Sequence, residues 1–309
     1  MFICQSQVIR SSPVSNQAAK EENIRCILFM ITAMAGFAIE DAVIKQLSYS
    51  MPVSQVLMLI GCGGVLTFGV TAMLTHVRLF VAEVIKPWFV IRTVSELASA
   101  IFFVIAIVYA SLSASSAILQ ATPLAVSLAA ALFLKQHVSG RQWILIAIGF
   151  VGVLCVIQPG LDGFKPAALF AIVGVMFLAL RDAITRSISV SIPAVAVSFW
   201  AFFALLMAGV VTVPFFADFT PVTLEQLGLL VVSTAAGTGA YFCIVMATRG
   251  GDVAVVAPFR YTRLLFALGL AVIFFDEDVN VMMILGSSLI IGSGIVMIVS
   301  SGSRRKQIH

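Results

Sequence analysis

The chain has 309 residues, of which 61% are hydrophobic and only 10% are charged. Soluble domains carry about 25% charged residues, so this composition excludes a soluble globular protein. The apolar residues occur in long blocks, which indicates a polytopic membrane protein. The net charge of +4 gives no sign of nucleic-acid binding, because the basic residues lie in short loops and tails.

The first 25 residues are polar and lack the apolar core of a signal peptide, so we expect a cytosolic tail there and a second one at residues 302–309. Between the tails, the apolar blocks predict an all-α membrane protein with ten transmembrane helices. The fifth is short for the roughly 20 residues that a span needs. The predicted spans are Cys26–Ile44, Val53–Leu74, Trp88–Tyr109, Ser113–Leu134, Trp143–Ile157, Pro166–Ile184, Pro193–Phe216, Leu224–Thr248, Ala254–Phe275 and Val279–Ser300.

The basic residues predict the orientation, because Lys and Arg in short loops favour the cytosolic side of a membrane. If the amino terminus is cytosolic and the spans alternate, twelve of the 18 Lys and Arg residues fall on the cytosolic side and two on the outer side. We therefore expect both termini to be cytosolic. The remaining four lie inside predicted spans and are Arg92, Arg181, Arg260 and Arg263.

The chain also contains an internal repeat. Ile27–Pro52 aligns on Ala168–Pro193 without a gap, and nine of the 26 aligned positions are identical. The same offset, continued along the chain, is called the repeat alignment below. The two repeats, residues 26–158 and 159–301, each hold five predicted spans. Because five is odd, the second repeat enters the membrane upside down relative to the first. Two inverted five-helix repeats are typical of alternating-access transporters; the alternative is a structural duplication without transport.

Arg260 and Arg263 lie within one predicted span, three residues apart, so that a continuous helix would place them on one face. A charge in the middle of a membrane costs roughly 3 kcal/mol on insertion scales, and such a residue usually faces a wet cavity or a partner. We interpret this face as part of a substrate path. The alternative is that both side chains extend to the cytosolic headgroups.

Two charged pairs correspond under the repeat alignment: Glu40 and Asp41 lie on Arg181 and Asp182. Asp41 and Asp182 are therefore equivalent positions in the two repeats. They are candidate proton-coupling or gating residues. A helix-end feature that both repeats inherited is an equally good interpretation.

Arg92 and Glu96 are four residues apart in the third predicted span, which predicts an ion pair on one helix face. The pair would serve as a structural link or as a proton relay. Glu96 is the deeper of the two and is our first candidate for a proton site. If Glu96 carries the proton, replacing it by Gln removes the pH response of transport.

The uncharged candidates for substrate contact are Gln120 and Tyr261 beside prolines at membrane depth, Tyr241 and Trp200. A proline inside a span frees a backbone carbonyl, which is tolerated where the backbone lines a cavity. Tyr241 follows Gly237 and Ser233 in a row with a spacing of four, which fits either close helix packing or a polar cavity wall. Trp200 would stack on a planar substrate or lie in the interfacial aromatic belt.

The sequence predicts neither an enzyme nor a cofactor. It has no phosphate-binding Gly-Lys motif, no HExxH and no plausible pairing of a nucleophile with histidine. The three histidines lie in polar connections or at the terminus, and the five cysteines are scattered without a CxxC pair, so no metal site is expected.

Two segments resemble the EamA-type transporters of the drug/metabolite transporter superfamily. One is Tyr109–Gln158, with a run of small residues, a mid-helix Thr-Pro and an apolar run to a charged turn; the other is APFRYTRLLFALGLAVIFFDED, which resembles the second copy. The chain departs from the family at Lys135-Gln136, where a Gly-Glu turn is usual. The resemblance implies transport of small metabolites across the bacterial inner membrane without ATP hydrolysis, through a central cavity lined by the first, third, fourth, sixth, eighth and ninth spans.

We therefore expect a secondary or facilitative transporter that moves a small polar metabolite by alternating access within the lipid bilayer. The two arginines would favour a carboxylate or phosphate, and the aromatic residues would suit a ring, as in a flavin or an amino-acid derivative. Protons are the expected coupling ion. The alternative is a non-transporting helper or sensor subunit of another membrane complex. The expected substrate contacts are Arg260, Arg263, Tyr261, Gln120, Tyr241 and Trp200, and the expected coupling or gating residues are Glu96, Arg92, Asp41, Asp182, Glu40 and Arg181.

Overall fold

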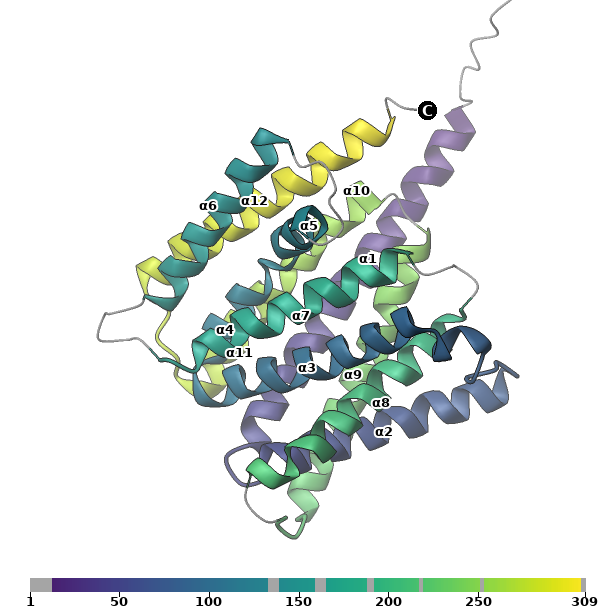
Figure 1. Ribbon diagram of the computed structural model, residues 1–309, viewed down its shortest axis with the longest axis vertical. Helices are drawn as coiled ribbons and strands as arrows, with labels where there is room; N and C mark the ends of the chain where they lie inside the picture. The colour runs from purple at the N-terminus through teal and green to yellow at the C-terminus, as the bar shows by residue number, and fades with distance from the viewer. Residues whose placement is uncertain are drawn as a thin grey trace, which may run out of the picture.

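The structure, a computed structural model, describes residues 13–132, 139–158, 165–187, 192–216, 219–250 and 253–306. Its described secondary structure is entirely helical (Figure 1). The α-helices are α1 (Pro13–Leu47), α2 (Val53–Leu74), α3 (Pro87–Tyr109), α4 (Leu112–Leu119), α5 (Thr122–Leu132), α6 (Gly140–Ile157), α7 (Ala168–Ser187), α8 (Ala194–Thr212), α9 (Leu224–Gly250), α10 (Val253–Val256), α11 (Thr262–Phe275) and α12 (Val281–Lys306). Short 3-10 helices are η1 (Ala82–Ile85), η2 (Val213–Phe215) and η3 (Ala257–Tyr261).

Within these ranges, eight helices are long and apolar enough to cross a membrane, and the protein is a multi-pass membrane protein. The apolar part of α12, Val281–Met297, is shorter. α6 is longer than predicted, because a capping box formed by Ser139 and Gln142 starts it at Gly140. At the amino terminus, α1 already begins at Pro13, so that part of the expected tail continues the first helix. Residues 1–12 and 307–309 of the two expected tails lie outside the described residues.

The fourth predicted span is not one continuous helix, which corrects the prediction. α4 ends at Leu119, and α5 begins only at Thr122. The proline at 123 has no backbone N–H and fits the first turn of a helix, so it favours a new start here. The hydroxyl of Thr122 donates a hydrogen bond to the carbonyl of Leu119, which satisfies a backbone acceptor freed by the break.

The ninth predicted span is also broken, into α10, η3 and α11. Under the repeat alignment, Gln120 in the first break corresponds to Tyr261 at the end of η3. The two breaks meet in space: the side-chain amide of Gln120 donates hydrogen bonds to the carbonyls of Tyr261, at 3.1 Å, and Arg260, at 3.4 Å. Non-helical backbone at this depth is tolerated where protein or a wet cavity surrounds it.

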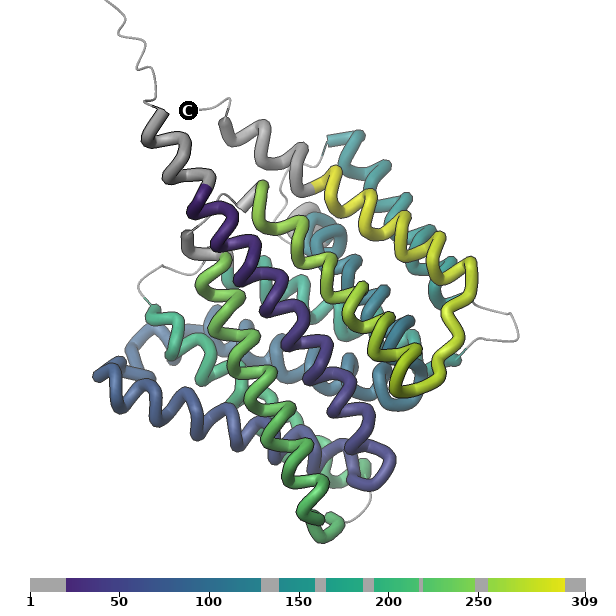
Figure 2. The backbone as a smooth tube through the Cα atoms, turned by 180° about the vertical axis from the view of Figure 1, so that it is seen from behind, coloured from purple at the N-terminus to yellow at the C-terminus, as the bar shows by residue number. Residues whose placement is uncertain are grey.

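Helix pairing follows a simple rule. α1 packs on α9 and α3 packs on α7, while α2 packs on α8 and α6 on α12. The repeat alignment maps α1 onto α7, α3 onto α9, α2 onto α8 and α6 onto α12. It therefore maps the α1–α9 contact onto the α3–α7 contact and the reverse. The α2–α8 and α6–α12 contacts map onto themselves. Figure 2 shows α1 running between α9 and α11, with α6 and α12 forming a separate pair at one edge.

Close backbone approach holds the α6–α12 pair. A Cβ atom added to Gly152 of α6 would lie 2.7 Å from the carbonyl oxygen of Gly286 on α12, and one added to Gly286 would lie 2.5 Å from the oxygen of Gly152. Only glycine fits at both positions. Such small-residue contacts let membrane helices pack backbone to backbone.

The connection after α11 binds the start of α4. The carboxylate of Glu277 accepts hydrogen bonds from the N–H groups of Leu112 (2.7 Å) and Ser113 (3.0 Å), and from the hydroxyl of Ser113. It also forms an ion pair with Lys45 near the end of α1. Burial by itself raises the pKa of Glu277, but the hydrogen bonds from Lys45, from the Ser113 hydroxyl and from the two backbone N–H groups outweigh it and lower the pKa below 4.5.

We predict that Glu277→Gln lowers the free energy of unfolding at pH 7 by about 3 kcal/mol, because it leaves the buried Lys45 without its anion. The folded-state pKa is the lower one, so the carboxylate stabilises the fold above pH 4.5, and this contribution is lost as the pH falls through the folded-state pKa. Unfolding in detergent between pH 3 and pH 7 measures both effects. Glu83→Gln, which removes an exposed partner of Lys86, is the control and should cost at most about 1 kcal/mol. Equal losses in the two variants would contradict the prediction.

Candidate functional site

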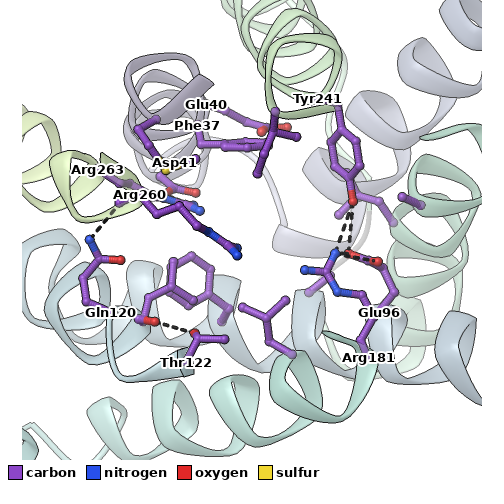
Figure 3. Close-up of a pocket in the computed structure, with 18 of the residues that line it drawn as sticks. Phe37, Glu40, Asp41, Glu96, Gln120, Thr122, Arg181, Tyr241, Arg260 and Arg263 are labelled. Atoms are coloured by element: carbon purple, nitrogen blue, oxygen red, sulfur yellow. Dashed lines mark hydrogen bonds and ion pairs between the residues drawn. The ribbon is translucent and has the colours of Figure 1, made fainter. Parts of the chain in front are cut away.

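A cavity of about 270 Å³ lies near the middle of the long helices (Figure 3). Its walls come from α1, α3, the α4–α5 break, α7, α8, α9, and η3 with α11. These elements include all six spans that the resemblance implied, and α8 in addition. The ionisable side chains that line the cavity are Glu40, Asp41, Glu96, Arg181, Arg260 and Arg263.

One group of charges surrounds Glu96 on α3. Its carboxylate pairs with Arg92 at 3.3 Å and with Arg181 of α7 at 2.9 Å, and the hydroxyl of Tyr241 lies 3.4 Å away. Arg92 is only 2% exposed and also donates a hydrogen bond to Thr185. The ion pair expected from the spacing of Arg92 and Glu96 is present. Its extension across α3, α7 and α9 favours the structural interpretation of this pair.

The second group joins the two predicted arginines to the equivalent aspartates of the two repeats. Arg263 pairs with Asp41 at 2.5 Å, and Arg260 lies 4.0 Å from Asp182. Asp182 is also paired with its neighbour Arg181, at 2.8 Å. Each aspartate therefore faces one arginine of the η3–α11 segment, across the middle of the molecule.

Arg260 and Arg263 both line the cavity, as interpreted from the sequence, but they face different aspartates. Arg260 lies in η3 and Arg263 in α11, which follows η3 directly. The Arg263 guanidinium is nearly buried and lies over the rings of Phe37 and Phe103, at 5.2 and 5.6 Å from their centroids, where cation–π attraction adds to its ion pair. Of the four arginines in these two groups of charges, Arg260 is the most exposed, with 39% of its side chain accessible to solvent.

Three of the uncharged candidates, Gln120, Tyr241 and Tyr261, line the cavity. The Tyr241 ring packs edge-on against Phe37 and Phe202. Gln120 is buried and holds the two helix breaks together. Tyr261 also lines the cavity, but its hydroxyl lies against Gly294 of α12, and no hydrogen-bond partner for it is found among the described residues.

Trp200, an expected substrate contact, is not among the residues that line this cavity. Its indole N–H donates a hydrogen bond to the carbonyl of Leu79, 3.2 Å away, in the connection between α2 and α3. The aromatic rings around it belong to Phe80, Phe89, Phe199 and Phe203. A half-buried tryptophan packed among aromatic side chains with its N–H satisfied stabilises the fold.

Sequence reasoning missed the aromatic walls of the cavity. Phe37 lies one helical turn before Asp41 on α1, a spacing that places both on one face and would have indicated it. Phe103 of α3 and Phe202 of α8 also line the cavity. Neither carries a signal in the sequence that separates it from the many other phenylalanines of the chain.

The sequence matches the EamA-like transporter family twice, over residues 24–158 and 165–300. The chain belongs to this family. This agrees with the resemblance of Tyr109–Gln158 to the EamA-type transporters of the drug/metabolite transporter superfamily.

Three similar EamA-like proteins carry names that state a substrate. The S-adenosylmethionine uptake transporter of Rickettsia bellii is 26% identical over 180 residues, which cover 58% of this chain and 60% of that protein. The pseudopaline exporter of Pseudomonas aeruginosa is 23% identical over 270 residues, covering 86% and 93%. The riboflavin transporter of Rhizobium johnstonii is 25% identical over 193 residues, covering 62% and 63%.

The match to the S-adenosylmethionine transporters spans less than two thirds of the length of those proteins. One solved crystal structure has the same fold, with a TM-score of 0.59 at 16% identity, and the superposition covers 93% of this chain and 99% of that one.

We predict that Asp41→Asn destabilises the protein by about 3 to 5 kcal/mol, because it leaves the Arg263 guanidinium nearly buried without its anion. Adding Arg263→Gln should recover most of this loss, since the pair is then removed as a unit. Unfolding of the single and double variants in detergent measures the coupling. If the two losses simply add, the ion pair does not hold the cavity wall.

Proposed function

We propose that this protein is an alternating-access transporter with ten spans in two inverted five-helix repeats, residues 26–158 and 159–301. The exchange of helix contacts under the repeat alignment supports this arrangement, because it is what a two-fold axis between the repeats requires. The α4–α5 and α10–η3–α11 segments are then the broken fourth and ninth spans. Their meeting point at Gln120 and Tyr261 lies between the repeats.

In this proposal the protein spans the inner membrane of a bacterium, with both termini in the cytoplasm. The excess of Lys and Arg in the loops on one side supports the orientation. The bacterial sources of the similar transporters support the membrane. Lys45, Glu277 and the start of α4 then form the contact that closes the outer end of the helices.

The substrate is a small polar metabolite that bears a carboxylate or a phosphate, with or without a ring. The observation that carries this is Arg260: its side chain enters the cavity and its nearest carboxylate partner, Asp182, is 4.0 Å away. A guanidinium with free N–H groups suits planar anions. The volume of about 270 Å³ is slightly below the roughly 300–1,000 Å³ of small-molecule sites, which favours an amino-acid derivative over a flavin.

Transport in this proposal is secondary or facilitative and proceeds by rocking of one repeat against the other. Asp41 and Asp182 are the best candidates for coupling to protons, because each faces an arginine of the η3–α11 segment. Protonation of Asp41 would release Arg263, and protonation of Asp182 would remove the nearest negative charge from Arg260. Glu96, Arg92 and Arg181 would act as the fixed support of the site, in keeping with their three-helix network.

We predict that Arg260→Ala reduces flux at least tenfold, because one charge-assisted contact to a substrate anion is worth about 1.5–3 kcal/mol. Proteoliposomes loaded with labelled amino acids, short dicarboxylates, nucleotides or riboflavin measure the flux. Arg78→Ala, in an exposed connection, is the matched control and should retain it. If Arg260→Ala inserts normally and transports as well as wild type, the cavity is not the substrate path. Co-purification with another membrane complex would then support the helper alternative.

A further inference from the structure

Glu40 is a cavity carboxylate without a partner. It lies on α1, is only 9% exposed and lines the cavity. In the part of the chain that the structure describes, no hydrogen bond or ion pair reaches its carboxylate. The nearby guanidinium of Arg263 is bound to Asp41. A buried carboxylate without a partner is costly, and such groups at membrane depth are usually functional.

The repeat explains why Glu40 lacks a partner. Under the repeat alignment, Glu40 corresponds to Arg181 and Glu96 corresponds to Gly237. Arg181 and Glu96 form an ion pair at 2.9 Å. The equivalent contact is Glu40 facing Gly237 of α9, where an added Cβ would collide with the carboxyl group. Both contacts join the two repeats, but one pairs a cation with an anion, whereas the equivalent contact holds a carboxylate and no cation.

Arg260 is a cavity cation without a close partner, as Glu40 is a cavity anion without one. It is 39% exposed and reaches no carboxylate closer than 4.0 Å among the described residues, whereas Arg263 is held at 2.5 Å. Figure 3 shows the Arg260 side chain extending into the cavity from the left, with Glu40 at the upper edge beside Phe37. The wall therefore offers one anion and one cation that the protein itself does not neutralise closely.

When all eight charged side chains of the site are ionised, their charges balance. Four arginines and four carboxylates belong to the cavity and its supporting network: Arg92, Arg181, Arg260 and Arg263, with Glu40, Asp41, Glu96 and Asp182. A neutral ligand keeps this balance, whereas an anion or a cation leaves an uncompensated charge in a medium of low dielectric constant.

We infer that the substrate is a net-neutral zwitterion, whose carboxylate pairs with Arg260 and whose ammonium pairs with Glu40. This inference rests on the proposed transport function and specifies its substrate class as an α-amino acid or a derivative that retains both charges. Phe37, Phe103 and Tyr241 line the cavity and contact the apolar part of the molecule. Gly237 of α9 lets the carboxyl group of Glu40 pack against its backbone, because a side chain at this position would collide with that group.

The test compares ligands that share a side chain and differ in charge. Three sets serve: phenylalanine, 3-phenylpropanoate and phenethylamine; methionine, 4-(methylthio)butanoate and 3-(methylthio)propylamine; leucine, 4-methylpentanoate and isoamylamine. The full-length protein in detergent is melted at pH 7 with each compound, since a ligand of the folded state raises the melting temperature. We expect at least one amino acid to stabilise the wild type, with its two singly charged relatives binding at least tenfold more weakly.

The variants assign the two charges. Glu40→Gln should lose the amino acid at least tenfold and gain relative preference for the carboxylate, because its cavity carries one surplus positive charge. Arg260→Gln should lose both ligands. Glu225→Gln, at the exposed start of α9, is the control and should behave as wild type. Should Glu40→Gln not fold, Glu40→Asp replaces it and should retain the preference for the zwitterion over both singly charged relatives.

The outcomes separate this inference from the proposed function. If the wild type binds carboxylates as well as amino acids and Arg260→Gln abolishes both, the zwitterion inference is overturned while an anion transporter remains. Stabilisation by amines alone, or by none of the amino acids, also overturns the inference. If Arg260→Gln binds every ligand as the wild type does, the proposed site itself is wrong.

Discussion

Pairing of charges in the middle of the helices is the constraint on which this structure depends. The Arg263–Asp41 and Arg181–Glu96 pairs join helices that are far apart in sequence, and each removes the cost of an isolated charge in a hydrocarbon environment. Each pair also fixes a wall of the cavity. The two groups left without a close partner, Arg260 and Glu40, then stand out among the described residues as the groups that a ligand can neutralise.

The broken helices follow from the same constraint. Arg260 lies in η3 and Arg263 in α11, and their guanidinium groups face different aspartates at different distances. One arginine is therefore buried in an ion pair while the other remains open to the cavity. Gln120 satisfies the freed carbonyls of this segment from the equivalent break in the other repeat, so that each break supports the other.

Composition and the repeat alignment predicted the helical class, the membrane-length helices and the charges that line the cavity, because these depend on residue type and spacing. The prolines at 123 and 258 indicated that the backbone lines a cavity near them. They did not predict that each of these two spans consists of separate helices. Partners could not be predicted: Asp41 and Arg263 are 222 residues apart, and no local pattern joins them. The hydrogen bond from Trp200 to Leu79, 121 residues away, could not be predicted for the same reason.

The measurement that tests the account most directly is an experimental structure of the protein with a bound α-amino acid. The account predicts the carboxylate within hydrogen-bond distance of the Arg260 guanidinium and the ammonium group within hydrogen-bond distance of Glu40, beside Gly237, with Asp41–Arg263 and Glu96–Arg181 still paired. An amino acid bound outside this cavity would contradict the central claim. So would one bound inside it with Glu40 contacting no ligand cation.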